Sequence, residues 1–462
     1  MNDSLRMSGP RKDALLVAGI AFAARTAVVV WAAVRIPPAA DGQFYHVIAS
    51  RIAQGLGYTW LWPDGAVTYA AHYPVGYPAM LGGLYTLFGP HPWVGMLANA
   101  VLGTGVAVLA HAIASEASSR RWALAAGILV ALHPALVPYT ASLMTEGLAM
   151  ALCTGAVALA MWARRAEGRR RTALVLGLGL ALGLGALVRP PTALLVLPLA
   201  WLATSPLPSV RKRIVHLALA GIVSLTVVSP WVVRNHVRMG EAGLSFNGGW
   251  NLLIGTNLSA KGTFAPLDVP EACREVFDEA KKDLCFGRAA RGRIAADPLG
   301  WVSLVPSKLG ATFDYCGAAG WYLHEASAEA FPYPAKVVLG VVETVYSRVV
   351  WLAALACVAL LPGPRRRVRM VVAVGTGVFL FTHYGWVGVL GLLAALLLLG
   401  KALDRAPLAV SGTAAVLGAT VLTHAAFFGG GRYGMVVLAL VATLVGARSR
   451  NDADSAKFLR NT

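Results

Sequence analysis

Apolar segments long enough to cross a bilayer recur along the whole chain, and they restrict the possible folds more than any other feature. An α-helix needs about 20 such residues to cross the hydrocarbon core, at about 1.5 Å per residue. Hydrophobic residues make up 57% of the chain and charged residues 13%, a balance outside the range of ordinary soluble domains. The sequence therefore predicts an all-α integral membrane protein that crosses the bilayer many times.

About twelve transmembrane helices are expected. Eight single crossings are assigned to residues 14–34, 94–113, 122–139, 143–162, 214–233, 341–361, 408–428 and 435–445. The stretches 172–204 and 370–400 are too long for one crossing and carry basic residues at both ends, which requires an even number of crossings. Each is therefore predicted to be a helical hairpin. The turns are placed at Val188-Arg189-Pro190-Pro191 and near His383-Tyr384-Gly385-Trp386.

The first crossing could be mistaken for a secretory signal peptide. It has the full length of a membrane span and contains Arg25, so it is interpreted as a retained anchor. For Arg25 itself, a buried packing role is favoured over a functional one.

Basic residues are concentrated in every second segment that connects two crossings. With both tails included, the segments that join every second pair of crossings carry 23 of the 40 Lys and Arg residues but only 7 of the 22 acidic residues. By the positive-inside rule these segments, and both termini, are predicted to be cytoplasmic in an inner (cytoplasmic) membrane. Because topology accounts for most of the net charge of +18, no nucleic-acid partner is expected.

Two long segments then face the periplasm or the outside, residues 35–93 and 234–336. The second is balanced in charge, with 11 basic and 11 acidic residues, and the mixed pattern of 270–296 suits amphipathic helices on the outer surface. We expect three parts: an N-terminal transmembrane module (1–233) whose first outer loop (35–93) carries the catalytic motif, a large outer loop (234–336) and a C-terminal transmembrane module (337–462).

Two cysteines, Cys273 and Cys285, fall on the large outer loop, in an oxidising compartment where disulfides persist. Continuous helix between them would hold their Cα atoms about 18 Å apart, whereas a disulfide needs roughly 4.4–6.8 Å. A disulfide therefore requires a turn between them, and whether they pair stays open.

Unusual polar residues gather at the outer ends of the crossings. An ionisable side chain at such depth is a functional candidate by default. The group comprises Asp41 and Tyr45 just past the first crossing, His72 and Tyr73 in a Pro-rich stretch, Glu146 one turn inside the fourth crossing, Arg189 at the tip of the first hairpin, and Arg432 and Tyr433 at the last outer turn.

Such a group suits the transfer of a sugar from a lipid phosphate. A carboxylate can take the proton of an acceptor hydroxyl as that hydroxyl attacks the anomeric carbon. Cationic donors, and planar Arg above all, can neutralise charge on the departing phosphate. One base and one cationic clamp suffice for a direct inverting displacement.

Each of these residues also has a simpler interpretation. Asp41 could merely cap the helix that begins near Phe44. Glu146 could form a structural ion pair with Arg189, and His72 could be an ordinary surface residue. Arg432 is less easily explained by packing, since the three glycines before it let backbone or ligand approach closely.

At these residues the chain resembles membrane glycosyltransferases of the GT-C superfamily, in the branch of protein O-mannosyltransferases and the lipid A aminoarabinose transferase (bacterial family 39/83-like). The ordered motif of the first outer loop is represented by Asp41, Tyr45, Ala49, Gly55, Gly57, Tyr58, Pro74, Gly76, Tyr77 and Pro78. Thr145-Glu146, Arg189-Pro190 and Arg432-Tyr433 fit later motifs, and the stretch from Asn247 to Asn257 resembles the start of the family's large outer loop.

The resemblance implies a GT-C fold with two long periplasmic loops, and Asp41 as catalytic base. It also implies a donor site for lipid phosphate or sugar, formed by Tyr45, His72, Tyr73, Glu146, Arg189, Asn247, Asn251, Arg432 and Tyr433, with a divalent metal possible at His72 and Glu146. Two departures are present. The acidic pair of the mannosyltransferases is here Asp41 followed by Gly42, and the basic residue before their Tyr-Pro motif is replaced by His72-Tyr73. The donor sugar and any metal stay open.

The predicted function is transfer of a sugar, with inversion, from a polyprenyl-phosphate carrier to a glycan, lipid or protein on the outer side, with the bilayer and the carrier lipid as partners. A polysaccharide polymerase or ligase is the first alternative, and it would depend on large-loop residues such as Arg234 or His236. A multi-span transporter is the second. It would need polar groups near the midplane, where Arg25 stands nearly alone.

Overall fold

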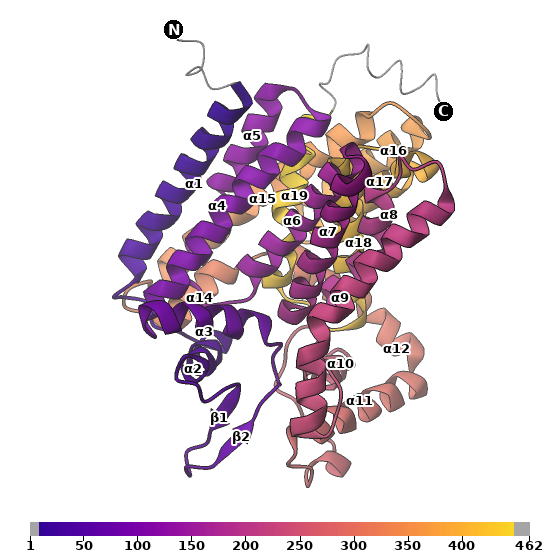
Figure 1. Ribbon diagram of the computed structural model, residues 1–462. Coiled ribbons are helices and arrows are strands. Elements are labelled where there is room, and N and C mark those ends of the chain that lie inside the picture. The colour runs from indigo at the N-terminus through magenta and orange to yellow at the C-terminus, as the bar shows by residue number, and fades with distance from the viewer. Residues whose placement is uncertain (1–8, 448–462) are drawn as a thin grey trace.

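Helices make up most of the computed structural model, which describes residues 9–447. Long helices stand side by side in a bundle, and shorter elements form a layer at one end of it (Figure 1). We call this layer, residues 41–88 and 248–326, the extramembrane layer. The predicted all-α membrane class is confirmed. The basic residues of the C-terminal tail, including Arg448 and Arg450, lie outside the described residues.

Twelve helices occupy the positions where crossings are expected. They are α1 (Gly9–Ala32), α4 (Pro92–Ala117), α5 (Arg120–Ala131), α6 (Glu146–Arg165), α7 (Gly168–Val188), α8 (Val196–Ala203), α9 (Val210–Met239), α15 (Tyr333–Leu360), α16 (Arg366–Gly377), α17 (Gly385–Leu397), α18 (Leu408–Ala426) and α19 (Met435–Thr443). Within the described residues, seven helices are long and apolar enough to cross a membrane, and three apolar segments are shorter, Pro190–Ala203, Gly385–Leu397 and Gly431–Thr443. The number of crossings therefore stays a prediction.

The extramembrane layer is built from short elements. The first loop forms α2 (Asp41–Ala53), an antiparallel hairpin of β1 (Thr59–Leu61) and β2 (Val67–Tyr69), and α3 (Gly76–Phe88). The second forms α10 (Gly248–Ile254), α11 (Glu279–Ala296), α12 (Pro298–Ser303), α13 (Val305–Phe313) and α14 (Ala318–Ala326). Short 3-10 helices are η1 (Pro138–Ala141), η2 (Pro190–Leu195), η3 (Glu271–Cys273), η4 (Val378–Phe381), η5 (Gly400–Asp404) and η6 (Gly431–Gly434).

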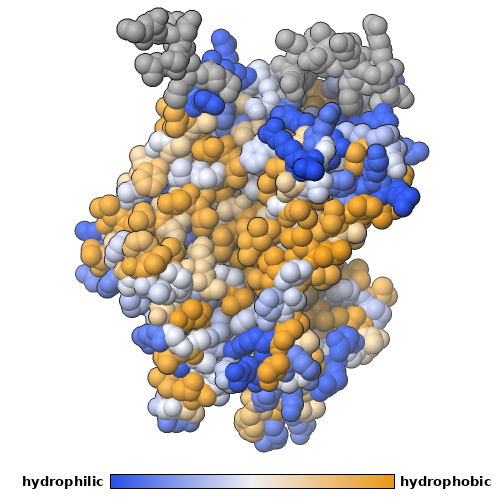
Figure 2. All heavy atoms as spheres, viewed as in Figure 1, coloured by the Kyte–Doolittle hydropathy of each residue, from blue (hydrophilic) through white to orange (hydrophobic). Residues whose placement is uncertain are grey.

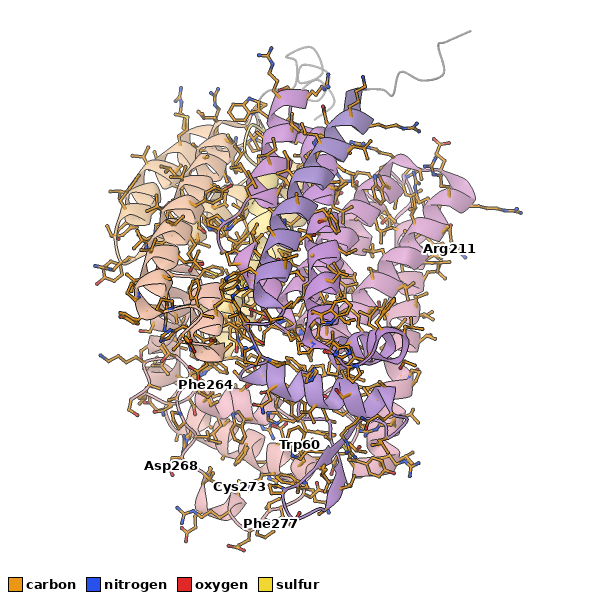
Figure 3. All side chains as sticks on the ribbon, turned by 90° about the vertical axis from the view of Figure 1, so that its left-hand side faces the viewer. Trp60, Arg211, Phe264, Asp268, Cys273 and Phe277 are labelled. Carbon is orange, nitrogen blue, oxygen red and sulfur yellow. A yellow bond between two sulfur atoms is a disulfide. The ribbon has the colours of Figure 1, made fainter. Side chains whose placement is uncertain are left out.

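The two ends of the bundle differ in chemistry. On the face that Figure 2 shows, apolar residues form a band across the middle of the molecule, and hydrophilic residues gather above and below it. Arg211, in one of the Lys- and Arg-rich segments that are predicted to be cytoplasmic, lies at the end opposite Phe277 of the extramembrane layer (Figure 3). The apolar band is the surface that hydrocarbon would cover.

Arg25 supports an interrupted helix. Helix α5 ends at Ala131 because Pro134 follows and cannot continue it, and this leaves carbonyl groups without helical partners. The buried Arg25 guanidinium donates to the carbonyls of Ala131 (2.9 Å) and Val130 (3.3 Å). Gly103 makes room, since a Cβ there would lie 2.3 Å from Arg25 Nε. The packing interpretation of Arg25 agrees with these contacts.

Cys273 and Cys285 form a disulfide, with Cα atoms 5.9 Å apart. The required turn is present, because η3 ends at Cys273 and α11 begins only at Glu279. Cys273 and Cys285 pack with Leu253 of α10 in one small apolar cluster. The disulfide therefore joins η3 to α11 at a distance from the bundle, as the position of Cys273 in Figure 3 shows.

Candidate active site

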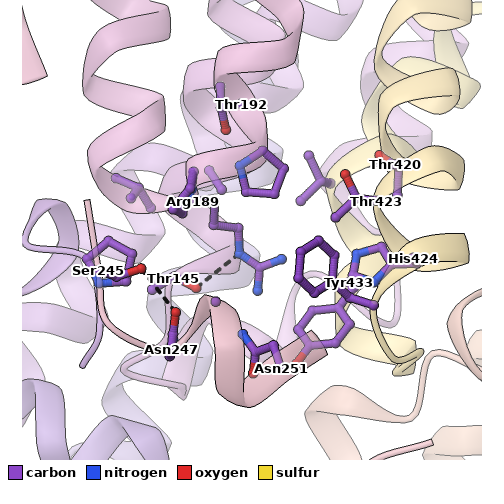
Figure 4. A pocket seen from close by; sticks show the side chains of 18 of the residues that line it. Thr145, Arg189, Thr192, Ser245, Asn247, Asn251, Thr420, Thr423, His424 and Tyr433 are labelled. Carbon is purple, nitrogen blue, oxygen red and sulfur yellow. Dashed lines mark hydrogen bonds between the residues drawn. The ribbon is translucent and has the colours of Figure 1, made fainter. Parts of the chain in front are cut away.

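A cavity of about 970 Å³ lies where the extramembrane layer meets the bundle. Nine of the ten residues predicted for the site line it: Asp41, Tyr45, His72, Tyr73, Arg189, Asn247, Asn251, Arg432 and Tyr433. The tenth, Glu146, is 1% exposed and lies behind the wall. Figure 4 shows Arg189 in the middle of the cavity, the amides of α10 on one side and the end of α18 on another.

Asp41 is held as an ionised carboxylate by two donors. Its Oδ1 accepts a hydrogen bond from the Tyr73 hydroxyl (2.8 Å), and its Oδ2 accepts one from Arg432 Nη1 (2.8 Å). Burial raises the pKa of Asp41, but the charge of Arg432 and the two hydrogen bonds outweigh burial and hold the pKa below its usual value. Asp41 is therefore ionised at neutral pH, as a base must be.

The capping interpretation of Asp41 is wrong for this structure. Asp41 is the first residue of α2 itself, the N-cap is Ala40, and no side chain caps this helix. Ala40 has a φ of 49°, a left-handed conformation that is unfavourable for a residue with a Cβ. The chain accepts this conformation at the turn that places the Asp41 carboxylate beside Tyr73 and Arg432.

Tyr73 and His72 are positioned by contacts between the two extramembrane loops. Ala71 donates its N–H to Glu279 Oε1 (2.7 Å) and accepts from the N–H of Phe246 (2.8 Å). These bonds fix the backbone just before His72. Burial, and then the nearby Asp41, raise the pKa of Tyr73, which stays a hydroxyl donor. Burial lowers the pKa of His72, so its imidazole is neutral at pH 7.

Two arginines share a buried counter-ion. Glu146 Oε1 lies 2.5 Å from Arg189 Nη2 and 3.7 Å from Arg432 Nε, and the Tyr139 hydroxyl donates to Oε2 (2.9 Å). Arg189 Nε also donates to Thr145 (3.2 Å). The ion pair that could be foreseen for Glu146 is present, and it includes a second arginine. Glu146 fixes both guanidinium groups at the cavity wall and is not itself exposed to a ligand.

Tyr433 lies between these cations and an imidazole. The guanidinium carbons of Arg189 and Arg432 are each 5.1 Å from its ring centroid, and the His424 ring stacks on it at 4.7 Å and 8°. Cations favour the electron-rich face of an aromatic ring. The stacked rings of His424 and Tyr433 therefore form a fixed wall beside the guanidinium groups of Arg189 and Arg432.

The glycines before Arg432 are needed for backbone packing. A Cβ on Gly429 would lie 2.0 Å from the Lys308 carbonyl oxygen, and one on Gly431 would lie 2.2 Å from that of Tyr315. Gly429 also donates its N–H to Gly262 (2.9 Å). The glycines therefore let the chain around α13 approach closely, which holds Arg432 in place.

A metal site gains no support. Among the described residues, no group of three or more His, Cys, Asp and Glu side chains could hold a metal ion. Glu146 is occupied by two guanidinium groups and a hydroxyl, and the His72 ring meets the edges of Tyr73 (4.7 Å) and Trp250 (5.7 Å).

Sequence reasoning missed several lining residues. His424, Thr420 and Thr423 of α18, Trp250 of α10 and the exposed Phe264 line the cavity but were not assigned a role. His424 carries a usable signal, because it is the one ionisable residue of α18 and lies near the end of that helix. Nothing in the sequence distinguishes Phe264 from other loop residues.

The residues on which the polymerase alternative depends lie elsewhere. Arg234 donates to the carbonyls of Tyr58 (2.7 Å) and Ala70 (2.9 Å), and its guanidinium carbon lies 4.7 Å from the Trp231 ring centroid. His236 is exposed. Neither is among the residues that line the cavity. Arg234 supports the first loop from behind.

Residues 72–233 match the model of a family described as dolichyl-phosphate-mannose-protein mannosyltransferase. The match includes His72, Tyr73, Glu146 and Arg189, whereas Asp41 and Arg432 lie outside it. The resemblance predicted from the motifs is confirmed for this part of the chain.

Two solved structures are similar to the chain. ArnT from Cupriavidus metallidurans bound to undecaprenyl phosphate is 19% identical, with 94% of this chain and 77% of that chain covered and a TM-score of 0.43. The archaeal oligosaccharyltransferase AglB from Archaeoglobus fulgidus, in complex with an inhibitory peptide and a dolichol-phosphate, is 14% identical, with 95% and 50% covered and a TM-score of 0.46. This chain thus spans half the length of AglB. At such identities and TM-scores neither structure determines its activity. No curated protein matches the chain significantly.

Proposed function

We propose that the chain is a membrane glycosyltransferase that moves a sugar from a polyprenyl-phosphate carrier to the hydroxyl of a glycan, lipid or protein acceptor, with inversion. The observation that carries the proposal is the pairing of Asp41 with Arg432 at 2.8 Å inside the cavity. A base and a phosphate-binding cation stand side by side there, as a direct displacement requires. The family match at residues 72–233 supports the same class of reaction.

In the proposed reaction Asp41 accepts the proton of the acceptor hydroxyl. The hydroxyl oxygen forms a bond to the anomeric carbon on the face opposite the phosphate. The bond between that carbon and the phosphate oxygen breaks, and its electron pair leaves with the polyprenyl phosphate. Arg432 and Arg189 neutralise the charge that grows on the leaving oxygen, and planar guanidinium groups suit phosphate oxygens.

The sugar would lie between Asp41 and the amides of α10. Asn247 is the N-cap residue of α10 and Asn251 lies in the first turn of that helix, and both line the cavity. Ser245 donates to Asn247 Oδ1 (3.0 Å), which orients that amide. Amide and hydroxyl groups of this kind can bind the hydroxyls of a sugar.

The proposed orientation follows from charge. Arg211, from the basic run Arg211-Lys212-Arg213, lies at the end of the bundle opposite the extramembrane layer (Figure 3). The positive-inside rule assigns that end to the cytoplasm. The cavity would then face the periplasm or outside of an inner membrane.

The test is sugar transfer by purified protein in nanodiscs from a panel of polyprenyl-phosphate sugars, with Asp41→Asn as the variant. We expect turnover with at least one donor, and its loss in Asp41→Asn while undecaprenyl phosphate still binds. Turnover that survives in Asp41→Asn would refute the mechanism.

Arg234→Lys serves as the control variant. It keeps a positive charge outside the cavity, so we expect it to retain most of the turnover. Loss of turnover in Arg234→Lys with an unaffected Asp41→Asn would favour the polymerase or ligase alternative. Uptake of a solute by proteoliposomes without any donor lipid would favour a transporter.

A further inference from the structure

The hydroxyl of Tyr322 lies just behind the proposed base, and the reaction described so far gives it no role. Tyr322 belongs to α14, is fully buried and does not line the cavity. Its oxygen accepts hydrogen bonds from two backbone N–H groups, that of Ala39 at 3.2 Å and that of Leu143 at 3.3 Å. Ala39 precedes Asp41 by two positions, and Leu143 precedes Glu146 by three. One hydroxyl therefore joins the segment of the base to the segment of the carboxylate that holds both arginines.

Gly42, the residue after Asp41, leaves room for this hydroxyl. A Cβ at Gly42 would lie 2.6 Å from the Tyr322 hydroxyl oxygen and 3.0 Å from the carbonyl oxygen of Leu143. Non-bonded heavy atoms prefer separations of about 3.5–4.0 Å, so any side chain here would push the start of α2 away from α14. Tyr322 thus explains the glycine, and a second acidic residue would not fit after Asp41 while this hydroxyl holds its place.

Helix α14 is itself fixed to the bundle. The N–H of Gly317, the N-cap residue of α14, donates to the buried carboxylate of Glu343 in α15. Tyr322 and the neighbouring Leu323 pack in the main hydrophobic core. Because α15 is one of the candidate membrane spans, the Tyr322 hydroxyl is a fixed point to which the start of α2 is bound.

The start of α2 needs such a fixed point. Ala40 has a φ of 49°, and a residue with a Cβ keeps this conformation only where surrounding contacts enforce it. The N–H of Gly42 donates to the carbonyl of Ala39 at 2.9 Å, which closes the turn on one side. The bond from the Ala39 N–H to Tyr322 holds the turn on the other side. Without that bond the turn can relax and carry Asp41 with it.

We infer that Tyr322 is a positioning residue whose hydroxyl fixes Asp41 relative to Arg189 and Arg432. The inference rests on the proposed function for the role of Asp41 as base. Loss of the hydroxyl would leave two buried N–H groups unpaired and would free the strained turn before Asp41. The two arginines would stay in place, because Glu146 of α6 holds them. The base would then be misaligned with an acceptor at an intact donor site.

The test compares Tyr322→Phe with Tyr85→Phe in purified protein in nanodiscs, supplied with a donor that the wild type uses. Tyr85 is the matched control. It is 2% exposed, it does not line the cavity, and its hydroxyl also contacts α2, at 2.8 Å from Nδ1 of His46. That contact involves a side chain beyond the first turn of α2 and leaves the backbone before Asp41 untouched. The kcat and the KM for the donor are measured, and the melting temperature confirms that each variant is folded.

Tyr322→Phe should lower kcat about 10- to 100-fold, because a displacement of about 1 Å can cost about 10² in rate. The KM for the donor should stay within about twofold of the wild-type value, since the arginines are not moved. Tyr85→Phe should keep the wild-type kcat. A wild-type kcat in Tyr322→Phe would overturn the inference. An equal loss of kcat in both variants would do the same, as would a rise in KM alone.

Gly42→Ala provides a second, independent measurement. The added methyl group meets the Tyr322 hydroxyl, so this variant should also lose activity by displacing the start of α2. In the double variant with Tyr322→Phe the closest contact of that methyl group is gone. The two losses should therefore not multiply, and the double variant should keep at least about tenfold more kcat than their product, as expected for residues in contact. Losses that multiply would mean that Gly42 and Tyr322 act separately, against the inference.

The outcomes separate this inference from the proposed function. Sugar transfer by the wild type, with an equal rate in Tyr322→Phe, would refute the positioning role and leave the enzyme. A wild type that uses no polyprenyl-phosphate donor would refute the proposed function and the role of Tyr322 within it. The contact with Gly42 would then be structural only, and coupling between Gly42→Ala and Tyr322→Phe would appear in the melting temperatures alone.

Discussion

Replacing Arg432 by glutamine should alter both the rate of sugar transfer and its pH dependence. Arg432 makes two ion pairs in the structure, a hydrogen-bonded one with Asp41 at 2.8 Å and a longer one with Glu146 at 3.7 Å. In the proposed reaction it also faces the donor phosphate. Glutamine keeps much of the volume and a hydrogen-bond donor but removes the charge.

The expected loss of rate follows from the geometry. Two unit charges about 4 Å apart interact by about 4 kcal/mol at an effective dielectric constant of about 20. The Arg432 side chain is 28% exposed, so solvent screening reduces this value. Removing one preorganised donor to a developing oxyanion typically costs about 10²–10³ in kcat. We expect a loss in this range for Arg432→Gln.

The pH dependence separates two roles of Arg432. Its charge is the strongest influence that lowers the pKa of Asp41 against the effect of burial. Asp41 acts as a base only when ionised, so activity falls as pH drops through its pKa. Without Arg432 that pKa rises, and the acid limb of the kcat/KM profile should move to higher pH.

Arg189→Gln is the matched control for the pH profile. Arg189 shares Glu146 with Arg432 but makes no contact with Asp41 among the described hydrogen bonds and ion pairs. Arg189→Gln should therefore lower kcat/KM without shifting the acid side of the pH profile. If both variants gave the wild-type acid limb, or if Arg432→Gln kept wild-type kcat/KM, the assigned roles of Asp41 and Arg432 would be incorrect.

Three further predictions concern stability, measured by thermal or denaturant unfolding in detergent. Replacing Cys273 and Cys285 by alanine should cost about 2–4 kcal/mol, and reductant should destabilise the wild type but not the variant. Burial raises the pKa of Glu279 to about 7. A carboxyl group whose pKa is raised by folding contributes its full stabilisation below pH 4.5, and this contribution is lost as pH rises through about 7. The variant Glu279→Gln should not show this decline in stability. Arg25→Leu should cost about 1–3 kcal/mol, because it leaves buried carbonyls unpaired, whereas Arg35→Leu, at an exposed site, should have little effect.

The sequence was informative wherever a single physical rule decides the outcome. Apolar length located the helices, and the asymmetry of Lys and Arg predicted which loops share a side. Together these rules placed Asp41, Arg189 and Arg432 at one end of the bundle, although Asp41 and Arg432 are 391 positions apart. The two rules that predict the membrane spans and their orientation thus also predicted which distant residues could lie close together.

The remaining features depend on packing between distant segments. The second partner of Glu146 could not be foreseen, because the approach of Arg432 depends on how η6 packs against α13. The glycines before Arg432 are likewise explained only by the carbonyls of Lys308 and Tyr315 that they meet.

The charges of the site couple donor binding to the proposed base. Two carboxylates, Asp41 and Glu146, balance two guanidinium groups, Arg189 and Arg432. Glu146 is enclosed and cannot exchange its partners for a ligand, whereas the Asp41 side chain is 23% exposed. In the proposed mechanism a donor phosphate therefore competes with Asp41 for Arg432. As it draws the guanidinium away, one Asp41 oxygen loses its hydrogen bond and the lowering effect on its pKa weakens, so the carboxylate becomes a stronger base. In the proposed mechanism the acceptor hydroxyl can reach that oxygen only once the donor is in place, so donor should bind before acceptor.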